Sequence, residues 1–238
     1  AFLPAVIGQP PASFADDFSR GAGNWTPYTN WERLEPQQWY WHPGGGYQGT
    51  GGYTFDHSRG KDTPQDALTM HLGSGSEGWS DYRARPRFTA RSGVKAGLWV
   101  RGTYRDQGAP GQWLTGYYCM VRVNPSSGDL LQLMQMRTTE DRGDPPEVND
   151  EYLYHIANPY LVQEQKLVTS LTFNEWHRLK VEVRGANVKC WVDDELAIDH
   201  TDTTGSIFLN GTIGLYVFGG RGYDAVISFD DVLVEPLN

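Results

Sequence analysis

The sequence has no long apolar run and no concentration of basic residues. A membrane-spanning helix needs roughly 18–20 consecutive apolar residues, and the longest apolar run here is far shorter. Asp and Glu outnumber Lys and Arg by 29 to 20, which gives a formal net charge of −9, and no Lys/Arg run stands against this balance. We therefore expect neither a membrane protein nor a nucleic-acid-binding protein, and we expect a monomer.

Cysteines and metal-binding motifs are also scarce. There are two cysteines, Cys119 and Cys190, and both lie in strand-like runs. They could form one disulfide between two sheets. However, packed sheets lie about 10 Å apart and a disulfide needs Cα atoms within about 7 Å, so two buried thiols are an equal alternative. The sequence has no HxH, HExxH or CxxC motif, which argues against a transition-metal site.

The first residues lack an initiator Met and a charged leader. The chain begins AFLPAVIGQ, and we expect the mature form of a secreted, extracellular protein. Two tripeptides, at Asn24 and Asn210, fit the N-glycosylation sequon and would be acceptors in a eukaryotic source. Such tripeptides also arise by chance, so they add little to the expectation of secretion.

Aromatic residues and glycines, in contrast, are abundant. Phe, Trp and Tyr make up 13% of the chain, and there are 28 glycines. Segments of five to ten residues alternate between apolar and polar side chains and are separated by Gly, Asn and Asp, which is typical of strands in a β-sandwich. We expect one all-β domain over residues 1–238. The expected strands are residues 67–72, 80–90, 95–105, 116–123, 129–137, 177–185, 187–198, 211–219 and 225–234.

Two stretches do not follow this pattern. Residues 1–60 are irregular, and residues 39–53 (WYWHPGGGYQGTGGY) form a Gly/aromatic stretch that we expect to be rich in loops. Residues 139–165 form a long polar excursion. Long loops in compact domains are commonly functional or disordered.

The alternation also divides the side chains between two faces. Leu98, Tyr117 and Leu215 are typical of the positions expected in the core. The opposite positions do not carry the Lys, Glu and Thr that are usual on a solvent face; they carry Trp99, Arg101, Tyr118, Arg122, Tyr216 and Phe218. Aromatic rings stack on sugar faces and guanidinium groups grip carboxylates. This face therefore predicts a groove for an extended polysaccharide, and the alternative is a sheet face that lies beneath a long loop.

The C-terminal third carries a recognisable pattern. FNEWHRLKVEVRGANVKCWVDDELAIDHTD, followed by GTIGLYVFGG and ISFDDVLVEP, resembles the concanavalin-like jelly-roll domains of carbohydrate-active proteins. Asp194 stands where these domains have Gly in a hairpin. The whole chain, with DDFSRGAGNW near its start, resembles the fungal endo-β-1,4-glucuronan lyases of polysaccharide lyase family 20. The resemblance implies a jelly roll with a concave substrate cleft, endolytic cleavage of polyglucuronate by β-elimination, a structural calcium ion and no organic cofactor.

Residue-level transfer from the related alginate lyases is incomplete. Their C-terminal concave strand ends in Lys-Ala-Gly-x-Tyr-Asn-Gln, of which Gly214 and Tyr216 match here, whereas the Lys and the Asn-Gln do not. Their central Gln-x-His is replaced by GLWVRG, which contains Arg101. The catalytic set implied by the resemblance is therefore not a simple copy.

β-Elimination from a uronate needs a group that neutralises the carboxylate, a base that takes the C5 proton and an acid that protonates the departing O4. We expect Arg101 in the first role, Tyr118 or Tyr216 as acid, base or both, and His57 as their partner. Trp99 and Arg122 are expected to bind neighbouring sugars.

Two other functions stay open. Hydrolysis needs two carboxylates on either side of the bond, and the Glu-x-Asp-x-x-Glu run of jelly-roll glucanases is absent. A non-catalytic glycan-binding module of the same fold is the main rival, since fold does not separate the two.

A calcium site is expected where the two ends of the sandwich meet. Asp16-Asp17 opens the first strand and Asp230-Asp231 lies in the last one. Carboxylate and carbonyl oxygens suit calcium, so Asp17 and Asp230 are the expected ligands, and solvated strand-end acids are the alternative.

Overall fold

The computed structural model describes residues 13–27, 39–56, 65–91, 94–105, 113–122, 129–137, 164–167, 171–205, 207–219 and 226–237. Within these ranges the chain forms strands and two short 3-10 turns, η2 (Tyr47–Gly49) and η3 (Ser76–Gly78). Among the described residues, no helix has the length and apolar character needed to span a membrane.

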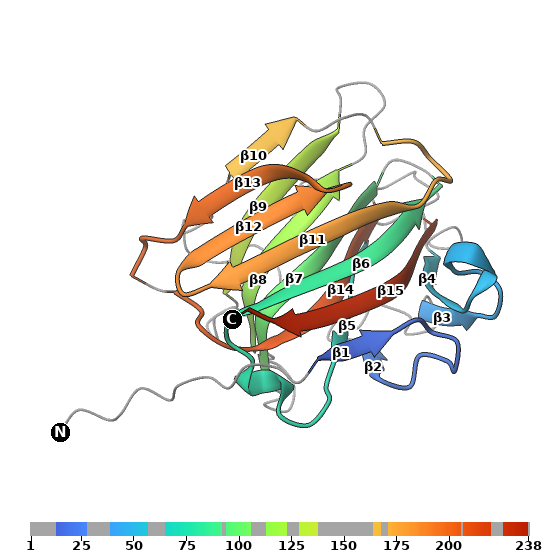
Figure 1. The fold of residues 1–238 in the computed structure, drawn as a ribbon, viewed down its shortest axis with the longest axis horizontal. Coiled ribbons are helices and arrows are strands. Elements are labelled where there is room, and N and C mark those ends of the chain that lie inside the picture. The colour runs from blue at the N-terminus through green and yellow to red at the C-terminus, as the bar shows by residue number, and fades with distance from the viewer. Residues whose placement is uncertain are drawn as a thin grey trace.

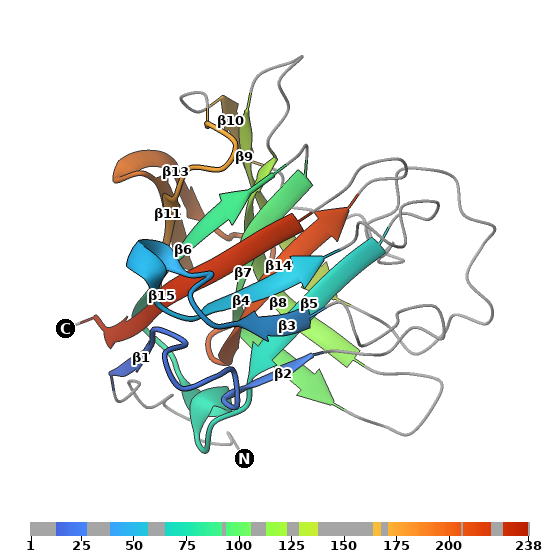
Figure 2. The ribbon, with the colours of Figure 1, turned by 90° about the vertical axis from the view of Figure 1, so that its right-hand side faces the viewer.

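The strands form two antiparallel sheets that pack face to face (Figures 1 and 2). The eight-stranded sheet, which faces the viewer in Figure 1, has the order β13-β12-β11-β6-β15-β4-β3, with β1 paired to β15. Its strands are β1 (Phe14–Asp16), β3 (Trp39–His42), β4 (Gly52–Asp56), β6 (Tyr82–Ala90), β11 (His177–Arg184), β12 (Asn187–Val192), β13 (Glu195–Thr201) and β15 (Val226–Pro236).

The seven-stranded sheet lies behind it, in the order β10-β9-β8-β7-β14-β5-β2. Its strands are β2 (Trp25–Pro27), β5 (Gln65–His71), β7 (Val94–Arg105), β8 (Trp113–Arg122), β9 (Leu130–Arg137), β10 (Glu164–Leu167) and β14 (Thr212–Gly219). Sequence-distant strands are neighbours in both sheets, as in a jelly roll, so the expected all-β sandwich of two antiparallel sheets is confirmed.

The core lies between the sheets and follows the period of two. In β6 and β11 buried and half-buried positions alternate without interruption. On the other sheet, Leu98, Tyr117 and Leu215 are each 0% exposed and belong to the same core. Burial of large apolar side chains at roughly 25 cal/mol per Å² is the main source of stability for such a sandwich.

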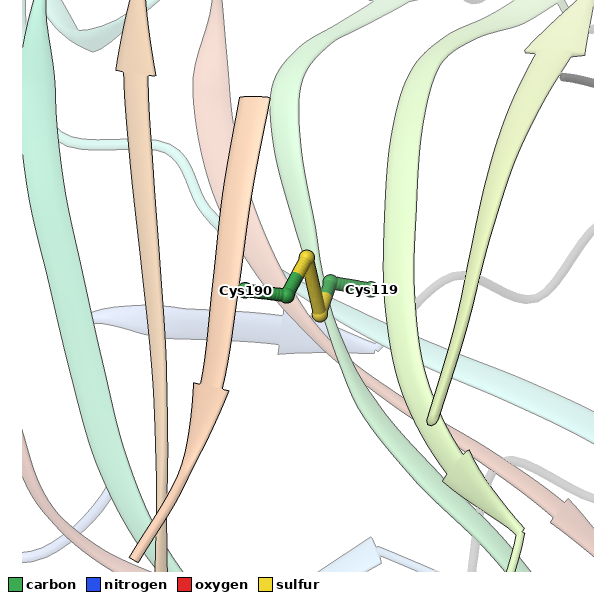
Figure 3. Close-up of a disulfide and its surroundings, with 2 residues drawn as sticks. All are labelled: Cys119 and Cys190. Atoms are coloured by element: carbon green, nitrogen blue, oxygen red, sulfur yellow. A yellow bond between two sulfur atoms is a disulfide. The ribbon is translucent and has the colours of Figure 1, made fainter. Parts of the chain in front are cut away.

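A disulfide joins the two sheets through the core. Cys119 of β8 and Cys190 of β12 are bonded across the sandwich, with their Cα atoms 6.5 Å apart (Figure 3). The sheets therefore come closer here than the spacing of about 10 Å that made a bridge uncertain. The open alternative between a disulfide and two thiols is resolved in favour of the disulfide.

Most expected strands are present within a few residues of their expected bounds. The stretch 187–198 is two strands, β12 and β13, because Asp193 and Asp194 adopt φ values of 48° and 67° and form the turn of a hairpin. In the region expected to be irregular, the structure has β1, β2, β3 and β4. These strands are too short for an apolar/polar alternation of period two to be recognised in the sequence. Of the excursion 139–165, only residues 164 and 165, at the start of β10, are described.

Candidate functional site

The face of the seven-stranded sheet that points away from the core carries a second cluster, which we call the candidate cleft face. Its buried members are Leu68, Met70, Trp99, Tyr118, Met120, Met134 and Tyr216. The ring of Tyr118 lies 6.3 Å from that of Trp99 and 4.9 Å from that of Tyr216. These three rings come from β7, β8 and β14 and are adjacent, as the alternation predicted. Each is at most 2% exposed, so a sugar would reach them only if this face opened.

Glycines make room for Trp99. A Cβ atom on Gly116 would lie 2.5 Å from Nε1 of Trp99, and Cβ atoms on Gly102 and Gly214 would also collide with the indole ring. The indole ring therefore packs closely against the backbone at these three glycines. Within the part of the chain that the structure describes, the buried Nε1–H of Trp99 has no hydrogen-bond partner. A buried donor without a partner is costly, and a sugar oxygen is one group that would satisfy it.

Two cations lie at one end of the candidate cleft face. Arg122 of β8 is exposed and is the direct cross-strand partner of Lys95 on β7. Cross-strand partners point to the same side of a sheet, so both cations are on the side of Tyr118. Tyr216 is opposite Gly97, which lies two residues from Lys95. Two residues of a strand span roughly 7 Å, so Tyr216 is the ring nearer to the cations.

A family model described as the 3-keto-alpha-glucoside-1,2-lyase-like domain matches residues 23–235. The chain belongs to this family. No curated protein matches it.

Several solved structures share the fold of this lyase-like domain. The β-glucanase of Bacillus licheniformis superposes with a TM-score of 0.57 at 11% identity, over 97% of this chain and 100% of that one. Alginate lyase Aly36B gives 0.51 at 11% identity, over 97% and 99% of the two chains. The carbohydrate-binding module CBM66 of Bacillus subtilis gives 0.50 at 20% identity, over 89% and 95%. At these identities the likeness shows the fold, and with the family it makes this chain a carbohydrate-active jelly-roll domain.

The structure does not place Arg101 beside Trp99, and this corrects the expected geometry. The pairing of β7 with β8 shifts register between Val100 and Thr103, and Arg101 adopts φ 49° at this bulge. An extra residue in a strand reverses the side on which the next side chains lie. The Arg101 side chain consequently enters the interior, where it is 0% exposed.

All three nitrogens of the Arg101 guanidinium make hydrogen bonds there. Its partners are the carbonyls of Ser80, Gly185 and Phe208 and the carboxylate of Asp81, with distances of 2.8 Å to Phe208 and 3.0 Å to Asp81. The backbone N–H of Arg101 also donates to the hydroxyl of Tyr82 at 2.7 Å. These partners flank strands of both sheets, so Arg101 links the two sheets at one end of the sandwich. None of the partners belongs to the candidate cleft face.

Among the described residues, no histidine belongs to the candidate cleft face. His57, the expected partner of the tyrosines, lies outside the described residues. His71 of β5 points to the opposite side from Leu68 and Met70, which belong to the candidate cleft face. Its ring is 4.0 Å from Phe14 and 5.4 Å from Trp79, and burial lowers its pKa.

The surroundings of Asp230 do not fit a calcium ligand. Its Oδ2 accepts hydrogen bonds at 2.6 Å from the backbone N–H of Tyr47 and from Oγ1 of Thr50, and its Oδ1 accepts one at 2.7 Å from the backbone N–H of Asp231. Calcium needs oxygen ligands, whereas these neighbours are donors. Asp17 is exposed and accepts from a nearby backbone N–H. Among the described residues, no group of three or more His, Cys, Asp or Glu could hold a metal.

Lys95 is the site residue that the sequence reasoning overlooked. The signal was present, because Lys95, Gly97 and Trp99 alternate onto one face of β7. Phe218 lies on a described strand, β14, but its side chain is not among those the structure describes.

Proposed function

We propose that this protein is a lyase that cleaves a β-1,4-linked polyglucuronate endolytically by β-elimination. The observation that carries the proposal is the direct pairing of Arg122 with Lys95 on the same face as Tyr118 and Tyr216. A guanidinium fork and an ammonium group together suit a sugar carboxylate. The family supports elimination as the reaction class, because its name is that of a lyase acting on a 3-keto-glucoside.

Elimination from a uronate and elimination from a 3-keto-glucoside share one requirement. A proton on a sugar carbon becomes acidic when the carbonyl group beside it is neutralised or polarised. In a uronate this group is the C6 carboxylate, the proton leaves C5, and the electron pair expels the sugar at O4 as the C4–C5 double bond forms. Arg122, with Lys95, takes the neutralising role that the sequence assigned to Arg101, because the guanidinium of Arg101 has no access to substrate.

Tyr216 is the better placed of the two tyrosines for proton transfer. Tyr216 is the cross-strand partner of Gly97, which is two positions from Lys95, whereas Tyr118 is four positions from Arg122 along β8. A nearby cation stabilises a phenolate and so favours a Tyr base. Because Tyr216 is 2% exposed, the proposal requires that the candidate cleft face opens when the polymer binds.

The deciding experiment is incubation with glucuronan, followed in parallel by ultraviolet absorbance and by a reducing-end assay. Elimination gives new reducing ends together with the absorbance of an unsaturated uronate. Arg122→Gln should lower turnover by roughly 10²-fold or more if it neutralises charge in the transition state. Arg91→Gln is the matched control, since Arg91 is also exposed but lies at the end of β6 in the other sheet.

Each other outcome assigns a different function. Reducing ends without the ultraviolet signal mean hydrolysis, and binding without either product means a glycan-binding module. Full activity of Arg122→Gln would overturn the role of this cation pair.

The family supports one second candidate, elimination from a 3-keto-glucoside. There the ketone at C3 acidifies the C2 proton, and the group at C1 departs. If the protein cleaves a 3-keto-glucoside and leaves glucuronan intact, this candidate replaces the first. Arg122 would then have no substrate carboxylate to neutralise.

We also propose that the protein works outside the cell. The Cys119–Cys190 disulfide supports this, because such bonds persist mainly in oxidising compartments. Calcium is not part of this proposal, because the contacts of Asp230 do not fit the expected pair of ligands.

A further inference from the structure

The outer face of the eight-stranded sheet carries a pocket that is separate from the candidate cleft face. It has a volume of about 310 Å³ and lies between β1, β15, β6 and β11, which are adjacent on the face toward the viewer in Figure 1. The charged residues that line it are Asp16, Asp17, Arg85, Arg87, Arg178 and Asp231. Val232 and Leu233 add apolar surface.

The arginines converge because of the strand pattern. In β6 every second residue is buried, so Arg85 and Arg87 both point outward. Arg178 of β11 is the direct cross-strand partner of Arg87. Like charges at directly opposed positions are unfavourable, so an anion bound in the pocket would relieve part of this repulsion.

Each of these arginines makes one ion pair with a carboxylate, and the guanidinium of Arg87 also lies over the ring of Tyr47, 3.8 Å from its centroid. Each guanidinium contacts one carboxylate, at 3.0 to 3.4 Å, and the carboxylate side chains are 37% to 67% exposed. The pairs are Arg85–Glu235, Arg87–Asp231 and Arg178–Asp194. Exposed ion pairs contribute little to stability, because water and salt screen them. A ligand carboxylate that takes a guanidinium through two parallel hydrogen bonds can therefore compete with them.

The aspartates determine which ligand fits. Three arginines and three aspartates cancel in formal charge, so a simple inorganic ion gains little from the pocket as a whole. Asp16 already accepts hydrogen bonds from Phe18 and Trp25. Asp17 is exposed, and its hydrogen bonds are with the backbone and the side chain of Ser19. Carboxylates accept from hydroxyl groups, and guanidinium groups donate to a carboxylate. A ligand that binds both the aspartates and the arginines of the pocket is therefore rich in hydroxyl groups and carries one carboxylate.

We propose that this pocket is a second sugar-binding site, which holds one carboxylate-bearing sugar unit of a polysaccharide. Arg85 and Arg178 bind the carboxylate, Asp17 accepts from ring hydroxyls, and Leu233 meets the apolar side of the sugar. The pocket is on the opposite side of the sandwich from Trp99 and Tyr216. It therefore tethers the polymer without occupying the candidate cleft face.

The test uses methyl β-D-glucuronide as the probe and methyl β-D-glucoside as the uncharged comparison, titrated into the protein and followed by NMR. We expect the glucuronide to bind and the glucoside to bind at least about tenfold more weakly, since a tenfold change corresponds to 1.4 kcal/mol. Arg85→Gln and Arg178→Gln should each weaken glucuronide binding by about tenfold or more.

Arg83→Gln is the matched control. Arg83 is on the same strand and the same face as Arg85, with side-chain exposures of 36% and 35%, and it pairs with Glu182 but does not line the pocket. Its removal should leave glucuronide binding within about twofold, because only the general field of the protein changes. Equal weakening in Arg83→Gln and Arg85→Gln, or equal binding of the two glycosides, would overturn the proposal.

The probe also separates this site from the proposed activity. Methyl β-D-glucuronide carries no sugar at O4, so its binding does not depend on turnover. Arg122→Gln should leave the binding that depends on Arg85 intact. If glucuronan is not cleaved but this binding is present, the proposed function fails and the second site stands; the reverse result removes the second site alone.

Discussion

Arg101 shows how much one buried cation supports at the scale of a single residue. Its guanidinium reaches three backbone carbonyls and Asp81. We expect Arg101→Ala to lower the free energy of unfolding by about 3–5 kcal/mol, because it leaves buried carbonyls and a carboxylate without their partner. Arg101→Lys should recover only part of this, since an ammonium group cannot reproduce the planar fork. Denaturant unfolding monitored by tryptophan fluorescence measures both changes.

A functional readout distinguishes this structural role from a catalytic one. At temperatures well below unfolding, the folded Arg101→Lys protein should turn over substrate at a rate close to that of the original chain. A large fall in turnover with unchanged stability would return Arg101 to the transition-state role that the sequence suggested.

His71 makes the free energy of unfolding fall as the pH drops below about 6.5. Burial lowers its pKa, and the carbonyl of Asn24 and the charge of Asp16 oppose this effect only in part. The unfolded chain, with a His pKa near 6.5, therefore binds the proton more readily than the folded one. The contribution of His71 to stability is complete above about pH 6.5 and is lost as the pH falls below it. We expect His71→Phe to flatten the pH dependence of the unfolding free energy in this range.

The contribution of His177 to the free energy of unfolding changes with pH in the opposite direction, so His177 serves as the comparison. Its Nδ1 is 2.7 Å from Asp193, and this hydrogen bond raises the pKa of His177. Its contribution is complete below about pH 6.5 and is lost as the pH rises through the higher folded value. His177→Gln should therefore remove a loss of stability above about pH 6.5 and leave the range between about pH 5 and 6.5 unchanged. Below that range Asp193, whose pKa is lowered by His177, also titrates. If both variants affect the same side, the assignment of one of them is wrong.

At the scale of the strands, the close approach of β7 to β8 depends on Gly116. Gly116 has φ 147°, and a Cβ atom there would lie 2.5 Å from Trp99 Nε1. We expect Gly116→Ala to cost roughly 1–3 kcal/mol from overpacking, in addition to its backbone strain, and to shift the fluorescence of Trp99. Gly75→Ala is the control, because Gly75 also has a positive φ, of 80°, but has open space around it. Equal costs for the two would show that the indole ring can move aside.

The link between β8 and β12 should dominate the redox behaviour of the sandwich. Cys119 and Cys190 are 71 residues apart, and closing a loop of this length in the unfolded chain corresponds to roughly 4 kcal/mol in the chain-entropy account. We expect a reductant to lower the melting temperature of the protein. The double variant Cys119→Ala, Cys190→Ala should melt lower than the oxidised protein and should not respond to reductant. A response that persists in this variant would mean that reductant acts elsewhere.

At the scale of the whole molecule, chelation tests whether an ion holds the sandwich together. The donors around Asp230 occupy the oxygens that calcium would need. We therefore expect an excess of chelator to leave the melting temperature unchanged. A bound ion would instead stabilise the folded state by mass action, and its removal would lower the melting temperature. A fall that is restored by added calcium would place the ion at ligands other than the expected pair.

Much of the candidate site was predictable because it depends on local alternation. Trp99, Tyr118 and Tyr216 lie on one face since every second residue of a strand points the same way. Arg101 was not predictable in this way, because one bulge reverses the sides that its neighbours predict. The pocket on the eight-stranded sheet was also hidden. Asp17, Arg85 and Arg178 are far apart in the sequence, and only the pairing of β1, β6, β11 and β15 brings them together.

The sequence by itself determined the class of the fold and the two faces of most strands, since a period of two and turn residues act locally. Only the tertiary structure decided which cations remain available to a ligand. Arg122 stays exposed, whereas the guanidinium of Arg101 donates hydrogen bonds to carbonyls of distant segments. The same holds for the approach of Cys119 to Cys190, because the spacing of two sheets depends on all the side chains packed between them.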